Sequence, residues 1–126
     1  LLCIKDRLQF FNAKRRVCQR LIEKEAIDDT GFCRVMNIAD GCLLLDIRKA
    51  IADFFGVPPS KVHPGDALDE FDYKTFELGL HMFVIGQILT NRNREIGPFV
   101  FPKQPMKDIQ DFVQETCRVL DLSRPT

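Results

Sequence analysis

The stretch FFGVPPSKVHPGDALDEFDYKTFELGL, residues 54–80, decides the fold, because one helix ends in it and another begins. Gly56 is a natural C-terminal stop for the first helix, and the two prolines that follow prevent its continuation. Residues 57–70 are predicted to form a loop, since they contain a further Pro-Gly pair. The stretch therefore predicts a helix, a long loop and a second helix that begins near residue 70.

The residues before this loop have the pattern of an amphipathic helix. Over residues 42–56, apolar side chains recur at helical spacing on one face. The residues predicted to face the core are Leu44, Ile47, Ile51, Phe54 and Phe55. The charged residues predicted to face solvent are Asp46, Arg48, Lys49 and Asp53.

Two more helices are predicted downstream. One runs from about residue 70 to about residue 90, and Phe83 is expected on its inward face. The other opens at Pro105 and Met106 and continues to about residue 120. Its predicted buried stripe consists of Ile109, Phe112, Val113, Cys117 and Leu120. Because no segment alternates for long enough to build a sheet, the predicted fold class is all-α.

A basic helix is predicted to precede these elements. Its span is residues 3–27, and its predicted apolar stripe consists of Ile4, Leu8, Phe11, Cys18 and Ile22, widened by Phe10, Val17 and Leu21. Arg15 interrupts this stripe, and the other basic residues populate the remaining face. Residues 1–27 carry seven basic and three acidic side chains, a net charge of +4, so the neutral chain carries −4 in its remainder. Residues 28–31, DDTG, are predicted to break the helix, and a short helix is expected before Gly41.

Length and composition indicate a soluble globular protein, with 126 residues of which 45% are hydrophobic and 29% charged. We expect a basic N-terminal helical extension, residues 1–41, and a helical bundle, residues 42–126. Five cysteines without a CxxC pair predict buried free thiols in a reducing compartment, and hence a cytoplasmic location. A zinc site that combines them with His63 or His81 lacks ligand spacing, so no metal is expected.

The first residues leave two interpretations open. The segment LLCI with its basic continuation is either the end of a membrane helix with a cytoplasmic flank or part of an ordinary helix. The ordinary helix is the preferred interpretation, and proximity to a membrane through the N-terminal end is the alternative. No nucleic-acid partner is expected, because the sequence pI is near 6.9 and the basic helix lacks aromatic interleaving.

From residue 42 to about residue 120, the order of elements resembles the acyl carrier protein family. In that family a loop leads into the motif Leu-Gly-x-Asp-Ser-Leu-x-x-Val-Glu-Leu at the start of the second helix. Leu68, Glu77 and Leu78 fit this motif, and Phe76 is a larger apolar substitute for its valine. The resemblance implies a small bundle of three main helices and one short helix.

The sequence departs from the family at the residue that carries the prosthetic group. The family's serine, which is joined to phosphopantetheine through a phosphodiester, is replaced by Asp72, and the aspartate before it by Phe71. A carboxylate cannot form that linkage. The chain's two serines, Ser60 and Ser123, both lie away from the start of this helix. The resemblance therefore implies the fold and a recognition surface without the cofactor or a catalytic role.

The acidic start of the second helix is the predicted partner-binding surface. Its residues are Asp69, Glu70, Asp72 and Glu77. In the carrier family this helix docks on basic patches of enzymes, so the resemblance implies a protein partner with a basic patch. Compensation of the helix dipole by the same carboxylates is an equally good explanation. The alternatives to such an interaction module are a genuine carrier modified at Ser60 and an unrelated small helical ligand-binding protein.

Overall fold

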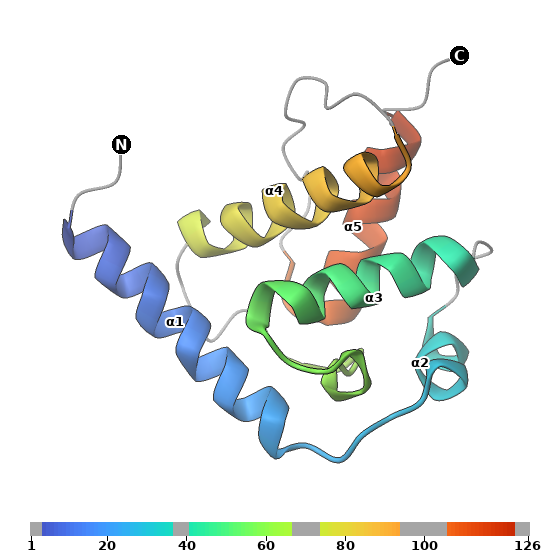
Figure 1. The fold of residues 1–126 in the computed structure, drawn as a ribbon, viewed down its shortest axis with the longest axis horizontal. Helices are drawn as coiled ribbons and strands as arrows, with labels where there is room; N and C mark the ends of the chain where they lie inside the picture. Colours follow the sequence, from blue (N-terminus) through green and yellow to red (C-terminus); the bar gives the residue numbers. More distant parts are fainter. Residues whose placement is uncertain (1–3, 37–40, 67–73, 94–105, 123–126) are drawn as a thin grey trace.

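The computed structural model of the chain describes residues 4–36, 41–66, 74–93 and 106–122. Every regular element in these residues is helical, which confirms the predicted all-α fold class. The elements are α1 (Ile4–Glu23), α2 (Asp29–Val35), α3 (Gly41–Phe55), the short 3-10 turn η1 (Pro59–Lys61), α4 (Lys74–Asn91) and α5 (Ile109–Leu122). Helix α3 contacts each of the other four α-helices and lies at the centre of the bundle (Figure 1).

Helix α3 is central because its apolar and charged residues are cleanly separated around its axis. All five residues predicted to face the core are buried, and Asp46, Lys49 and Asp53 are exposed as predicted. The helix ends at Phe55, where Gly56 adopts a positive φ of 69° that favours glycine. The prediction for Arg48 was wrong, since this side chain is only 1% exposed.

Helix α1 packs on the bundle with one edge of the predicted apolar stripe, where Val17 and Leu21 were predicted to widen it, and not with the centre of the stripe. Its buried side chains are Ala13, Val17 and Leu21. Members of the predicted stripe are instead exposed, with Leu8 at 57%, Phe11 at 62% and Ile22 at 52%. The helix thus has two apolar stripes. Arg15 lies in the middle of the predicted stripe. Burying its charge without a partner would cost more free energy than burying the stripe that contains no charged residue.

Helix α2 begins inside the segment that was predicted to be a break. The side chain of Asp28 accepts a hydrogen bond from the backbone N–H of Gly31, at 2.7 Å, and so caps the first turn. Phe32, one turn into the helix, is fully buried. Together with Val17 of α1 it belongs to the same hydrophobic core as the residues of α3, α4 and α5. Residues of the predicted N-terminal extension therefore contribute to the core of the bundle.

The predicted phase of α4 was also wrong. Phe83 is 40% exposed, although its ring lies edge-on to Phe54 with the centroids 5.3 Å apart. His81 is fully buried and packs edge-on against Phe112, with the ring centroids 5.9 Å apart. The physical reason is that α4 is apolar nearly all round, since residues 78–91 contain no acidic residue, lysine or arginine. Sequence spacing then gives no clear indication of which side faces the core.

Helix α5 closes the bundle with the predicted stripe. Four of the five predicted residues are buried, and Cys117 is half-buried. The helix begins at Ile109, three residues later than predicted, where the Asp108 carboxylate accepts a hydrogen bond from the N–H of Asp111 at 2.8 Å. Near its C-terminal end, Arg118 donates a hydrogen bond to the Glu115 carboxylate, and this bond raises the pKa of Arg118.

Candidate functional site

The predicted partner-binding residues lie largely outside the part of the chain that the structure describes. Asp69, Glu70 and Asp72 belong to the segment between residues 66 and 74, outside the described ranges. Glu77 belongs to α4, but its side chain is not among those described. The acidic docking surface therefore stays a prediction.

The structure instead brings together a set of residues whose polar contacts with one another were not predicted from the sequence. We call it the polar junction; it joins the connection between α1 and α2 to the loop around η1 and to one side chain of α3. Its members are Lys24, Glu25, Ile27, Asp29, Arg48, Ser60, Lys61, Val62, His63 and Asp66.

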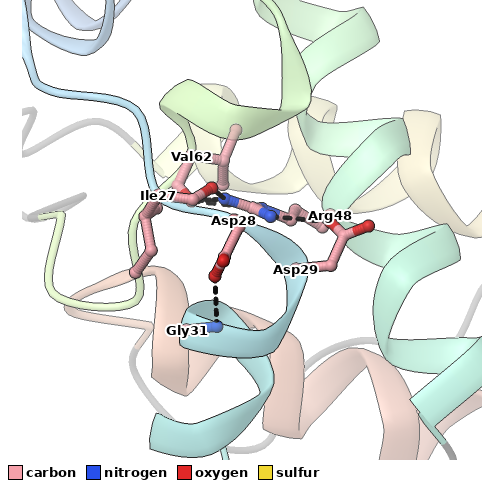
Figure 2. Close-up of polar contacts among 6 residues, drawn as sticks. All are labelled: Ile27, Asp28, Asp29, Gly31, Arg48 and Val62. Carbon is pink, nitrogen blue, oxygen red and sulfur yellow. Dashed lines mark hydrogen bonds and ion pairs between the residues drawn. The ribbon is translucent and has the colours of Figure 1, made fainter.

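Arg48 is the centre of this junction (Figure 2). Its Nη1 donates to Oδ1 of Asp29 at 2.8 Å, and its Nη2 donates to the carbonyl of Ile27 at 2.6 Å. Both Nε and Nη2 donate to the carbonyl of Val62, at 3.3 and 3.2 Å. The guanidinium also lies over the ring of Phe32, 4.5 Å from its centroid. One buried side chain thus links α3 to α2 and to two connecting segments.

The chemistry of arginine explains why it is found here. Its planar fork presents five donors and stays charged, so it can satisfy several acceptors in one plane. The carbonyls of Ile27 and Val62 would otherwise be left with fewer partners at the edge of the core. The Asp29 side chain is 65% exposed, so the ion pair itself is partly solvated and contributes less than the backbone contacts. Arg48 is therefore a structural clamp.

Asp66 forms the second half of the junction. Its carboxylate is 4% exposed, forms an ion pair with Lys24 and accepts the backbone N–H of His63 at 3.1 Å. The Asp66 carbonyl accepts the backbone N–H of Ile109 at 2.9 Å, at the start of α5. This residue therefore holds the loop after η1 to α1 on one side and to α5 on the other.

Three further contacts fasten the α1–α2 connection to the loop. Nε2 of His63 lies 2.6 Å from the carbonyl of Glu25, and because a carbonyl only accepts, this nitrogen carries the proton. The ammonium of Lys61 donates to the carbonyl of Lys24. The carbonyl of Ser60 accepts the N–H of Ile27 at 2.8 Å. Ser60, the alternative attachment residue, is thus half-buried in this junction and does not lie at the start of α4.

The junction resembles a structural network more than a reactive centre. Lys24 and Arg48 each form an ion pair in which one of the two groups is buried. The ring of His63 is hydrogen-bonded to a backbone carbonyl. Within the described residues, no group of three His, Cys, Asp or Glu side chains could hold a metal ion. The four described cysteines are free thiols, as predicted, but the prediction that they are buried was wrong, since Cys42 is exposed and the other three are half-buried.

Sequence reasoning missed Arg48 and Asp66 because both are polar residues with partners far along the chain. A signal for Arg48 was present in its spacing, since it lies four residues after Leu44 and seven before Phe55, both of which are buried. Residues four apart lie on the same face of a helix, so this spacing places Arg48 on the face that Leu44 and Phe55 bury. No comparable signal in the sequence marks Asp66.

The exposed side of α4 is the other feature of interest. Met82 is 56% exposed and Phe83 is 40% exposed, next to each other on a helix segment without charged residues. The side of Gly86 is also open, since an added Cβ would meet nothing within 4 Å. Because monomeric domains rarely leave neighbouring large apolar side chains in water without a purpose, this surface is a candidate for protein contact.

Comparison with known proteins adds no relative: no family model, no curated protein and no solved structure matches this chain. Among the helices that the structure describes, none has the length and apolar character required to cross a membrane.

Proposed function

We propose that this chain is a non-catalytic protein-interaction module of the acyl-carrier type that lacks the phosphopantetheine serine. The observation that carries the proposal is the exposed apolar pair Met82 and Phe83 on α4, the helix that follows directly on the acidic segment. An apolar contact flanked by charge is the usual composition of a transient protein interface. Asp72 at the attachment position supports a role that needs no prosthetic group.

The partner that fits this surface is a protein with an apolar depression bordered by basic residues. Met82 and Phe83 would supply the apolar contact, and Asp69, Glu70, Asp72 and Glu77 would supply electrostatic steering. The free thiols are in keeping with a reducing compartment, so we propose a cytoplasmic location.

A cross-linking experiment tests the surface. A photoreactive amino acid placed at Met82 is expected to capture a protein from the native host, whereas the same group at exposed Gln114 of α5 is not. The captured protein is then purified, and its affinity is measured for Met82→Ser/Phe83→Ser and for Gln114→Ser. We expect the first variant to bind about ten-fold more weakly or worse, as for other apolar interface anchors.

The charge part of the proposal has its own measurement. Asp69→Lys with Glu70→Lys should slow association of the same partner, and its salt dependence should become flatter, because steering is screened within about 8 Å at physiological salt. Equal capture from positions 82 and 114, or unchanged affinity of the Met82→Ser/Phe83→Ser variant, would contradict the proposal.

A further inference from the structure

Helix α1 has an apolar stripe that the bundle leaves uncovered. Its packed face, with Ala13, Val17 and Leu21, is turned toward α3 and α4. The exposed stripe contains Leu8, Phe11 and Ile22, each more than half exposed, whereas Cys18 between them is half-buried and packs against the core. Figure 1 shows α1 along one edge of the molecule, where no other helix of the described residues lies on its outer side.

The residues of this stripe follow the spacing of a coiled-coil seam. Positions 8, 11, 15, 18 and 22 alternate by three and four residues, which is the apolar repeat that packs one helix against another. The seam extends over about 21 Å at 1.5 Å per residue. We call residues Leu8, Phe11, Arg15, Cys18 and Ile22 the α1 seam.

The α1 seam lies in a positively charged part of the helix. Residues 8–22 contain Lys14, Arg15, Arg16 and Arg20 but no aspartate or glutamate. Arg15 is exposed at the centre of the seam. Lys14 marks one border, because its ammonium lies over the ring of Phe54 at 4.6 Å from the centroid. Any helix that covers the seam must therefore supply a carboxylate to Arg15, since an unpaired charge in an interface is costly.

We propose that the α1 seam binds an acidic amphipathic helix of another protein, whose apolar residues repeat by three and four and whose Glu or Asp faces Arg15. This surface lies on a different helix from Met82 and Phe83, so the inference goes beyond the proposed function and does not depend on it. The chain would then have two separate protein contacts, one directed to a basic partner and one to an acidic partner.

A second copy of this chain is a poor occupant. Two α1 seams would bring eight basic residues together over this short length, without a carboxylate from either set of residues 8–22. The apolar contact of a few side chains is small against that repulsion and against the desolvation of two Arg15 guanidinium groups. Charge complementarity therefore favours a partner of opposite sign.

A membrane surface also fits less well than a helix. Helices that lie in the lipid interface insert a broad apolar face, with the basic residues on the opposite side. In α1 the second apolar stripe is turned into the bundle, which leaves a narrow seam with Arg15 at its centre. A narrow seam with a 3-4 repeat matches the ridge of another helix.

The test uses two designed helical peptides of about three heptads, each with leucine at the seam positions and glutamate on the flanks. One has glutamate at the position that faces Arg15, and the other has lysine there. Binding to the full chain is measured by fluorescence anisotropy. We expect the glutamate peptide to bind, and Arg15→Glu to weaken its binding about ten-fold or more. The lysine peptide should recover affinity for Arg15→Glu.

Phe11→Ser is the apolar counterpart and should weaken the binding of both peptides. The control variant Val35→Ser, at an exposed apolar residue of α2, should leave both affinities unchanged. Far-UV circular dichroism checks that each variant is folded. Absence of binding by the glutamate peptide at about 1 mM, or an Arg15→Glu loss that the lysine peptide does not recover, would overturn the proposal. Binding to phosphatidylserine vesicles that is lost in Phe11→Ser, without peptide binding, would assign the seam to a membrane. A sedimenting dimer lost in the same variant would assign it to a second copy.

Discussion

Replacement of Arg48 by alanine is expected to lower the free energy of unfolding by about 3–5 kcal/mol, which is a large part of the stability of a domain of this size. The side chain is 1% exposed, and its removal would leave the carbonyls of Ile27 and Val62 without their donors. It would also open a cavity beside Phe32. Urea denaturation followed by circular dichroism gives the measurement.

Two control variants separate the contributions to this loss. Asp29→Asn should cost less than about 1 kcal/mol, because the carboxylate is 65% exposed and its ion pair is screened by water. Arg48→Lys should cost nearly as much as alanine, since one ammonium cannot reproduce the planar fork. Hydrogen exchange at Ile27, whose N–H is bonded to Ser60, should quicken in the Arg48 variants. An Arg48→Ala loss below about 1 kcal/mol would mean that the guanidinium is not the clamp.

The second large effect is expected at Phe112, which is fully buried and packs against His81. Phe112→Ala should cost about 3–5 kcal/mol, the usual range for a buried phenylalanine. Phe83→Ala is the matched control, because the same atoms are removed from a side chain that is 40% exposed. We expect it to cost less than about 2 kcal/mol, in proportion to the smaller area that it buries.

The comparison of these two phenylalanines tests the phase of α4 and α5 directly. Both variants are measured by urea denaturation under the same conditions, and only their difference matters, so uncertainty about the unfolded state largely cancels. Equal losses in the two variants, or a larger loss for Phe83→Ala, would contradict the placement of Phe83 on the outer side of the bundle.

The predictions from sequence were most accurate for the helices in which most apolar residues lie on one face and most charged residues on the other. In α3 and α5, most charged residues lie on the face opposite the apolar ones, with buried Arg48 and Glu115 as exceptions, and the predicted core residues Ile47, Ile51 and Phe112 are buried. In α4, apolar residues surround the axis, so the pattern could not place Phe83. Helix α1 has two apolar stripes, and which of them is buried depends on Arg15, because its charge is costly to bury in a seam without a carboxylate.

The candidate site was less predictable than the fold, because its contacts join residues far apart in the chain. Arg48 reaches Asp29 across 19 positions and Val62 across 14. Spacing within one helix carries no information about such partners. The N-cap at Asp28 depends only on nearby residues and could therefore have been predicted from the sequence. The DDTG segment was instead interpreted as a break, because two turn-forming residue types stand together in it. The acidic docking residues lie outside the described ranges and stay predictions.

The central claim, that this chain acts by binding without a prosthetic group, is tested most directly by its intact mass. The chain is co-expressed with a phosphopantetheinyl transferase of broad specificity, with a genuine acyl carrier protein as the positive control, and both are weighed by mass spectrometry. We predict that the control gains the mass of the phosphopantetheine arm and that this chain keeps the mass of its unmodified sequence. A gain of that arm, mapped by peptide analysis to Ser60 or Ser123, would contradict the account and establish the chain as a carrier.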